Sequence, residues 1–150
     1  MDTLARLEAV EEIRRLKAAY FRTMDTKDWD GFAEVFTRDA VMDMSGEMRD
    51  GRTGGAGVTR GNVAIAAFVK GAVDPVETVH HGHMSEIEIT SPTTAKGIWS
   101  MEDMLRWPDG RELHGYGHYL DVYEKVDGDW RIASSTLTRL RMDFTEAPDT

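Results

Sequence analysis

The chain from residue 77 to its end carries a nearly continuous strand pattern, and this pattern most restricts the possible folds. After a first strand that begins at Glu77, three long strands are predicted at Ala95–Trp107, Glu112–Lys125 and Trp130–Phe144. The turn sequences PDG and DGD separate these three. Because the strands are similar in length and the turns are short, consecutive antiparallel hairpins are the simplest arrangement.

The preceding part of the chain is mainly helical in pattern. Thr3–Asp25 is predicted to form one long amphipathic helix, with Thr3 as a candidate cap. Shorter helices are predicted at Asp28–Phe36 and Asn62–Val73, and a short strand at Ala40–Met44. Helices followed by antiparallel strands are typical of the α+β class. A long curved sheet with helices packed over its concave face would leave a pocket between the two layers.

Apolar residues recur along the long helix at three- and four-residue steps and form one stripe, while charged residues such as Lys17 lie on the other faces. The stripe comprises Leu4, Leu7, Val10, Ile13, Leu16, Tyr20 and Met24.

Ser45–Gly61 contains six glycines and is predicted to be a mobile loop or a hairpin. It contains neither GxGxxG nor GxxxxGK[ST], which argues against nucleotide binding.

Composition excludes several classes of function. A length of 150 residues predicts a single domain over residues 1–150, and the absence of cysteine excludes disulfides and thiolate metal sites. A net charge of -9 argues against nucleic acid or an anionic membrane as partner. The N-terminus lacks the apolar core of a signal peptide, and no apolar run approaches the ~18 residues of a membrane span. A cytoplasmic location is therefore expected.

Alternation places polar groups on apolar faces of the predicted sheet. Asp103 shares a face with Trp99, Met101, Leu105 and Trp107, where a carboxylate is costly unless it is paired. The next strand groups His114, Tyr116, His118, Leu120 and Val122 on one face, and the last strand places Arg139 beside Leu137. These groups are expected either to converge on a ligand pocket or to form a purely architectural Asp103–Arg139 ion pair.

Three of the five histidines lie within ETVHHGHMSEIEI, at positions 80, 81 and 83. Alternation from Ile87 and Ile89 favours His81 and His83 as the inward residues, whereas a bulge near Gly82 would turn His80 inward instead. His81-x-His83 followed by Glu88 also resembles the HxH…E metal set of cupins, but a cupin would not begin with some 70 mainly helical residues. No metal is expected.

Four segments together carry a family resemblance: EAVEEIRRLKAAYFRTMDTKDWD, HHGHMSEIEI, TTAKGIWSMEDMLRW and VYEKVDGDWRI. They resemble the SnoaL-like branch of the NTF2-like superfamily over about Glu8 to Phe144. Within that branch the chain most resembles bile-acid 7α-dehydratase, and more distantly scytalone dehydratase and hexachlorocyclohexane dehydrochlorinase. The resemblance implies a cone-shaped, curved, mixed or antiparallel sheet whose pocket is closed by N-terminal helices. It also implies a homo-oligomer, a trimer by family habit, with a dimer as the alternative.

The resemblance further implies the residues of the site. The catalytic set falls on Tyr20, Asp25, His80, Asp103 and Arg139. A second tyrosine of the family is replaced here by Met44, which indicates a different substrate. The substrate contacts expected from resemblance and alternation together are Met44, His83, Trp99, Met101, Tyr116 and His118.

The implied chemistry is a cofactor-independent, dehydratase-type elimination from a bulky hydrophobic, steroid-like or polycyclic small molecule. His80 would be the general base, Asp25 would orient it, and Tyr20 would donate to a developing enolate oxygen. Asp103 would be a second acid–base group because tryptophans surround it, and Arg139 would hold Asp103 or a substrate oxygen. An isomerase or cyclase would use the same parts. A non-catalytic small-molecule-binding module remains the third alternative.

Overall fold

The computed structural model describes residues 1–46 and 57–149, and these residues contain three helices and six strands. The α+β class predicted from the sequence is confirmed. In chain order the elements are α1 (Thr3–Asp25), α2 (Trp29–Glu34), β1 (Phe36–Gly46), β2 (Val58–Arg60), α3 (Asn62–Val73), β3 (Glu77–Ser91), β4 (Thr94–Arg106), β5 (Glu112–Val126) and β6 (Asp129–Thr145).

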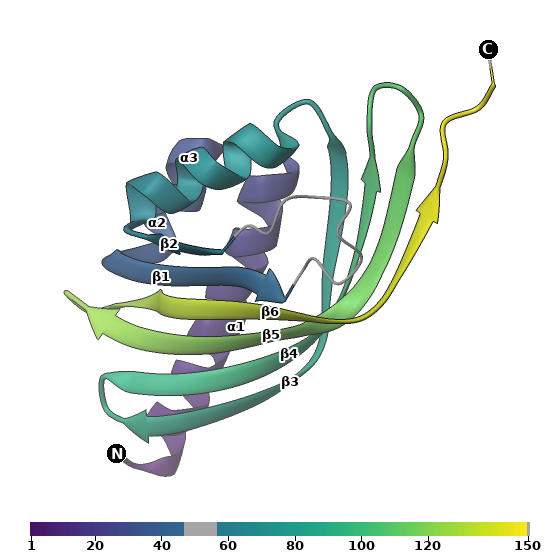
Figure 1. Cartoon of the computed structure of the whole chain (residues 1–150). Helices are drawn as coiled ribbons and strands as arrows, with labels where there is room; N and C mark the ends of the chain where they lie inside the picture. Colours follow the sequence, from purple (N-terminus) through teal and green to yellow (C-terminus); the bar gives the residue numbers. More distant parts are fainter. Residues whose placement is uncertain (47–56, 150) are drawn as a thin grey trace.

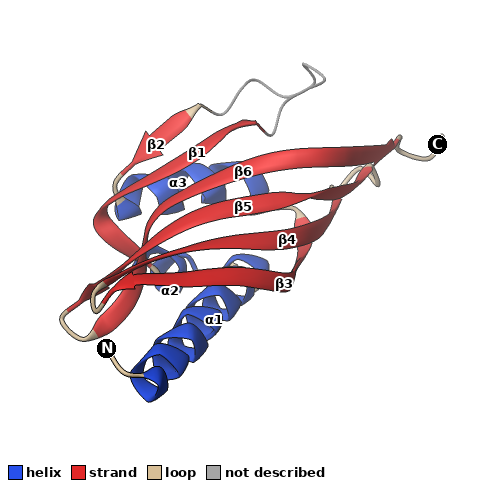
Figure 2. Cartoon of the chain, turned by 90° about the horizontal axis from the view of Figure 1, so that it is seen from below, coloured by secondary structure: helices blue, strands red, loops and turns tan. Residues whose placement is uncertain are grey.

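The strands form one curled sheet in the order β2-β1-β6-β5-β4-β3. Strands β3 to β6 pair with their sequence neighbours in antiparallel fashion, so the predicted run of hairpins is confirmed. Strand β1 lies parallel to β6 and antiparallel to β2, which makes the sheet mixed. The sheet curves without closing, and all three helices pack on its concave side (Figures 1 and 2). This arrangement matches the NTF2-like fold implied by the sequence.

Helix α1 has the predicted bounds, but its cap and its buried face differ from the prediction. Asp2, rather than Thr3, caps the helix, and its carboxylate accepts the backbone N–H of Ala5 at 2.8 Å. Leu4 and Leu7 are exposed, and the first buried residue of the helix is Ala9. The correct stripe continues through Ile13, Lys17, Tyr20 and Met24. Among the described residues, no helix combines the length and apolar character needed to cross a membrane.

The glycine-rich segment is only partly described. Val58, Thr59 and Arg60 pair antiparallel with Asp43, Met42 and Val41, so the hairpin interpretation holds for these residues. Residues 47–56, the centre of the predicted loop, lie outside the described residues.

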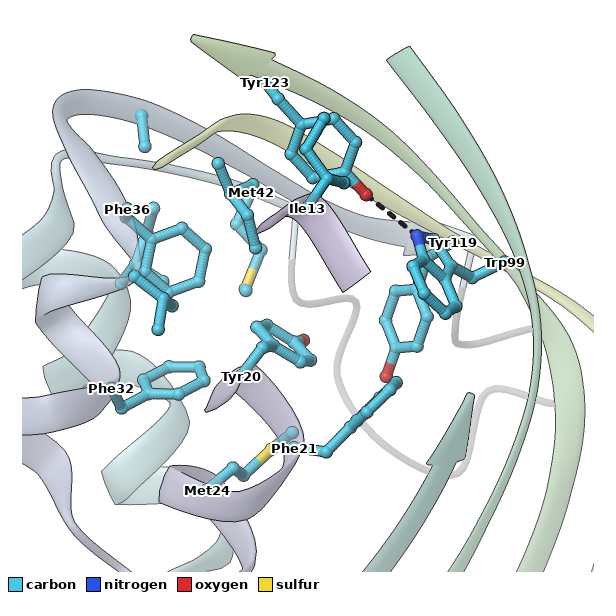
Figure 3. Close-up of a cluster of buried hydrophobic side chains, with 14 of the residues drawn as sticks. Ile13, Tyr20, Phe21, Met24, Phe32, Phe36, Met42, Trp99, Tyr119 and Tyr123 are labelled. Carbon is cyan, nitrogen blue, oxygen red and sulfur yellow. Dashed lines mark hydrogen bonds between the residues drawn. The ribbon is translucent and has the colours of Figure 1, made fainter. Parts of the chain in front are cut away.

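Aromatic side chains from the helices and the sheet meet around Tyr20 in the core (Figure 3). The centroid of the Tyr20 ring lies 5.3 Å from that of Phe32 and 5.6 Å from that of Tyr119. The edges of such rings prefer the faces of their neighbours, and this interlocking fixes ring orientation as well as burying apolar area. Tyr20 is therefore held rigidly between α2 and the sheet.

A buried ion pair joins α1 to the sheet next to this aromatic cluster. Lys17, which the helical pattern placed on an exposed face, is fully buried, and its Nζ lies 2.7 Å from Oδ2 of Asp121. Asp121 also accepts hydrogen bonds from Tyr123 and Ser135. Burial lowers the pKa of Lys17, while the charge and hydrogen bond of Asp121 oppose that shift. The Lys17 amine lies 3.8 Å from the centroid of the Tyr119 ring, so the pair supports an aromatic wall from behind.

Candidate active site

A β-bulge in β3 decides which histidine faces inward. His80 pairs with Asp103 and Gly82 with Met101, but Ser85 already pairs with Trp99, so β3 contains one extra residue after Gly82. Of the two alternatives that the sequence left open, the structure therefore contains the bulge near Gly82. Only 7% of the His80 side chain is exposed, whereas His81 and His83 are each 50% exposed. The alternation-based preference for His81 and His83 was wrong because it assumed an unbroken register from Ile87.

Asp25, the last residue of α1, contacts His80 at two points. The Nδ1 atom of His80 lies 2.6 Å from Oδ1 of Asp25, and the backbone N–H of His80 donates to Oδ2 at 2.9 Å. Thr78 adds a third bond, because its hydroxyl donates to Oδ1 at 2.9 Å. Burial raises the pKa of Asp25, but these bonds and the charge of His80 outweigh it and hold the pKa below its ordinary value.

The ionised carboxylate of Asp25 fixes the tautomer of the imidazole. A carboxylate can only accept hydrogen bonds, so the proton of a neutral His80 ring resides on Nδ1. The Nε2 atom then carries a free lone pair on the side of Asp103, whose Oδ2 lies 3.8 Å away. The ring of Phe21 lies almost parallel to the imidazole, with centroids 6.1 Å apart, and restricts its rotation.

Asp103 on β4 and Arg139 on β6 form a buried two-point ion pair. Nη1 of Arg139 donates to Oδ1 of Asp103 at 2.7 Å, and Nη2 donates to Oδ2 at 2.9 Å. The two side chains are 4% and 1% exposed. The sequence left open a pocket or an architectural ion pair, and the structure contains both, because Asp103 belongs to the pair and also lines a cavity.

The ion pair crosses over β5, and glycine makes the crossing possible. Gly115 is the cross-strand partner of Asp103, and Gly117 is the partner of Arg139. A Cβ atom at Gly115 would collide with both Nη1 of Arg139 and Oδ1 of Asp103. The absence of a side chain at this position therefore leaves the space that the two charged groups occupy.

The cavity between the helices and the sheet has a volume of about 660 Å³, and its walls are mainly apolar. Its polar groups come from His80, Asp103, Tyr20 and Tyr119, and also from Arg111, Thr145 and Glu146. The remaining wall comes largely from α3, β1 and the ends of β4, β5 and β6, and includes Met42, Met44, Phe68, Val73, Leu105, Trp107, Leu113, Leu137, Met142 and Phe144. A few placed polar groups in an apolar chamber of this size are typical of a small-molecule site.

Tyr119 is a cavity residue that sequence reasoning missed. Burial, followed by the influence of Tyr20 and Asp103, raises the pKa of Tyr119 well above its ordinary value. The rings of Tyr119 and Tyr20 meet edge to face, with centroids 5.6 Å apart. Both phenols line the cavity, and the hydroxyl of Tyr119 stays protonated over the physiological range. The pair can therefore supply a hydrogen-bond donor to a ligand oxygen.

The structure places the five residues of the expected catalytic set at the wall of one cavity or directly behind it. Tyr20, His80 and Asp103 line the cavity. Asp25 lies behind His80, and Arg139 lies behind Asp103. Both oxygens of Asp103 are engaged by Arg139, which is one of the two roles expected for Arg139 from the sequence. Met44, which was expected as a substrate contact, also lines the cavity.

Tyr116 and His118 do not lie in the cavity wall, so their expected role as substrate contacts was wrong. The inward face of β5 consists of the odd-numbered residues, such as Tyr119 and Asp121. The signal that could have shown this is the hairpin register, since β4 and β5 pair odd residues with odd residues, as in Asp103 with Gly115. Alternation within one strand does not say which face is inward, but pairing with a neighbour of known orientation does.

Three of the other expected contacts, Trp99, Met101 and His83, also lie outside the cavity wall. Trp99 is buried in the core beside the cavity, where its indole N–H donates to the hydroxyl of Tyr123 at 2.8 Å. Met101 packs against Arg139. His83 lies on the outer face and contacts Glu102 at 3.1 Å. The cupin-like set is not assembled either, because Glu88 pairs with Lys96 on the sheet surface.

Comparison with known proteins finds a matching domain family and a similar protein. Residues 5–136 match the model of the SnoaL-like domain. The probable cyclase FGR4 of Gibberella zeae is 27% identical over 148 residues, which cover 89% of this chain and 92% of the relative.

Solved structures share the fold. A protein of Novosphingobium aromaticivorans, provisionally named scytalone dehydratase, superimposes with a TM-score of 0.84 at 21% identity and covers 98% of this chain and 94% of its own. Hexachlorocyclohexane dehydrochlorinase LinA-type3 from Novosphingobium barchaimii gives a TM-score of 0.82 at 18% identity, with coverages of 99% and 98%. The predicted resemblance to these two kinds of enzyme is confirmed at the level of fold. The resemblance to bile-acid 7α-dehydratase stays a prediction.

Proposed function

Because the chain belongs to the SnoaL-like domain family, we propose that it is a cofactor-independent lyase that eliminates water from a bulky, hydrophobic, polycyclic small molecule. The observation that carries the proposal is the environment of His80. Its Nδ1 is held by Asp25 at 2.6 Å, while the ring lines an apolar cavity. An imidazole with one nitrogen fixed and the other free is suited to accept and return a proton.

The elimination would proceed through two proton transfers at one atom. The Nε2 atom of His80 takes the proton from a carbon next to a substrate carbonyl, and the electrons of the C–H bond form an enolate. The enolate then expels the hydroxyl from the adjacent carbon, and this oxygen takes the proton back from Nε2 and leaves as water. Asp25 stabilises the imidazolium between these steps, because its carboxylate lies against Nδ1.

The enolate oxygen would be stabilised by the phenols of Tyr20 and Tyr119. Both line the cavity with His80, and the raised pKa of Tyr119 keeps its hydroxyl as a donor. Asp103, neutralised by Arg139, would hold the leaving hydroxyl or the product water near Nε2. The two phenol hydroxyls act in a largely apolar environment, where hydrogen bonds to developing charge are stronger than in water.

Cyclase or isomerase chemistry is the second candidate, and the relative FGR4, itself named a probable cyclase, favours it. Both reactions can begin with the same proton abstraction by His80. They differ from elimination in what leaves the substrate, since a cyclised or isomerised product has the mass of the substrate. The mass of the product therefore separates the two candidates.

The test uses a panel of polycyclic β-hydroxy ketones, including steroids, incubated with the purified protein. Elimination would appear as loss of water by mass spectrometry and as the absorbance of a conjugated enone. We expect His80→Gln and Asp25→Asn each to lower kcat by about 100-fold or more, the usual range for losing a positioned proton-transfer group. His114→Gln is the matched control, because this histidine lies on the outer face beside Glu102.

Each outcome bears on the proposal. Loss of water that depends on His80 and Asp25 but not on His114 would support it. A product of unchanged mass with the same dependence would favour the cyclase or isomerase instead. Turnover that survives both the His80 and the Asp25 replacement would refute the assigned site. Tight binding of the panel with no turnover at all would favour a binding module.

A further inference from the structure

The turn that follows α1 places a lysine where glycine is usually found. The backbone N–H of Lys27 donates to the carbonyl of Met24 at 3.2 Å, and that of Asp28 donates to the carbonyl of Thr23 at 2.8 Å. These two bonds define a Schellman motif, whose first residue beyond the cap adopts a left-handed conformation and is usually glycine. Lys27 occupies this position with a φ of 61°. A side chain there is strained, which suggests that the side chain itself is needed.

The side chain of Lys27 reaches back toward the candidate active site. Its Nζ donates to Oγ1 of Thr78 at 3.0 Å, and the same hydroxyl donates to Oδ1 of Asp25 at 2.9 Å. That oxygen of Asp25 is also the one that contacts Nδ1 of His80. Lys27, Thr78, Asp25 and His80 therefore form one continuous chain of hydrogen bonds.

The order of donors in this chain gives Lys27 a defined effect. A hydroxyl has a single proton and rotates to suit its partners. Because an ammonium can only donate, it occupies a lone pair of the Thr78 oxygen and directs the Thr78 proton toward Asp25. Thr78 is 6% exposed and β-branched, so its side chain has little freedom to turn away. Asp25 is thereby held at the same oxygen that contacts the imidazole.

We propose that Lys27 is kept in the strained left-handed position because its amine acts, through Thr78, as a positioning group for the His80–Asp25 pair. Neither residue touches the substrate. Their effect on turnover rests on the proposed function, whereas their effect on the hydrogen bond between Asp25 and His80 does not. The two effects can be measured separately.

The test compares two replacements by glycine. Lys27→Gly removes the amine and relieves the strained backbone. Asp127→Gly is the matched control, because Asp127 is the other non-glycine residue with a positive φ in the described chain, at 51°, and lies in the turn between β5 and β6. We expect both variants to melt at or above the wild-type temperature, since glycine favours this conformation.

Only Lys27→Gly should alter the site. We expect the NMR resonance of the His80 Nδ1–H proton to move in Lys27→Gly and in Thr78→Val, and to stay in place in Asp127→Gly. The double variant Lys27→Gly/Thr78→Val should match Thr78→Val alone, because the amine acts through the hydroxyl. With an active substrate, Lys27→Gly should lower kcat by about tenfold, the value of one charge-assisted hydrogen bond, and leave KM nearly unchanged.

An unchanged Nδ1–H resonance in Lys27→Gly would overturn the inference, and so would a double variant whose shift is the sum of the two single shifts. A shifted resonance in a protein that shows no elimination activity would instead refute the proposed function and leave the positioning role in place. Lys27→Met separates the amine from the backbone strain, because it keeps an unbranched side chain at the left-handed position but removes the charge. It should reproduce the resonance shift of Lys27→Gly.

Discussion

Gly115→Ala is the replacement for which the structure gives the most specific expectation. The added Cβ would occupy the position where Nη1 of Arg139 meets Oδ1 of Asp103. Both atoms end flexible side chains, so the collision can be relieved by moving them. Moving either one breaks the ion pair, whose side chains are 4% and 1% exposed. The stability lost in Gly115→Ala therefore depends on the disruption of the ion pair rather than on the backbone.

The expected magnitude follows from the bonds that are lost. A hydrogen bond to a charged group contributes about 1.5–3 kcal/mol, and removing one partner of a buried ion pair costs about 3–5 kcal/mol. Here both charges survive and can turn toward the cavity, so we expect about 2–3 kcal/mol, reduced by up to about 1 kcal/mol because alanine restricts the unfolded chain. A net loss of about 2 kcal/mol corresponds to a decrease in Tm of roughly 4–8 °C for a domain of this size.

Urea unfolding, followed by tryptophan fluorescence, measures this loss. The same replacement is then made in a background in which the pair is apolar, Asp103→Leu with Arg139→Met. Gly115→Ala should cost much less there, because no ion pair remains to be displaced. Gly71→Ala is the control for exchanging glycine in general, since a Cβ at Gly71 meets no atom within 4 Å. It should gain up to about 1 kcal/mol in α3.

Two results would refute the reasoning. One is a Gly115→Ala variant as stable as the wild type, which would mean that the pair tolerates the methyl group. The other is an equal loss in the charged and the apolar backgrounds, which would mean that the methyl group collides with something else. Either result would also weaken the view that Gly115 provides the space in which Asp103 and Arg139 meet.

Three further predictions concern charged and phenolic groups. Because folding lowers the pKa of Asp25, its contribution to stability should be complete above the ordinary carboxyl pKa of about 3.9 and lost as pH falls through the folded value. The free energies of unfolding of wild type and Asp25→Asn, measured in urea, should therefore become equal at acid pH. A difference that stays constant with pH would contradict this. Lys17→Met should lower the free energy of unfolding by about 3–5 kcal/mol, because it leaves the charge of Asp121 unpaired. The double variant Lys17→Met/Asp121→Asn should recover part of this stability in the same assay, and no recovery would argue against a charge effect. Tyr119→Phe should lower kcat by about tenfold if its hydroxyl donates to the enolate, with a Tm within a few degrees of wild type, and unchanged turnover would exclude that role.

The sequence was sufficient to predict the elements that depend on local rules. The bounds of α1 and α3 and the run of hairpins follow from apolar periodicity and turn residues. The bulge near Gly82 was only one of two alternatives that the sequence left open. The convergence of Asp25, His80 and Asp103 required the family resemblance in addition. Alternation alone would have chosen His81 and His83.

Two errors show where local rules end. Tyr116 and His118 share a face with Leu120 and Val122, so the wrong face of β5 appeared at least as apolar as the right one. Only pairing with β4 across the hairpin distinguishes the two faces, and pairing is a property of two strands. Lys17 could not be recognised as buried because its partner Asp121 lies 104 residues away in the chain. A charged residue in a helix is predicted to be exposed unless its partner is known.

The bulge in β3 also affects how this protein meets other copies of itself. Strand β3 is an outer strand of the sheet, and the backbone groups along such an edge can pair with a strand of another molecule and begin aggregation. The extra residue after Gly82 breaks the regular spacing of those groups, and Glu86 and Glu88 add charge to the edge beyond it. Deleting the extra residue would keep His80 opposite Asp103 and Ser85 opposite Trp99, but it would make the pairing regular and so leave a long continuous edge open to intermolecular pairing.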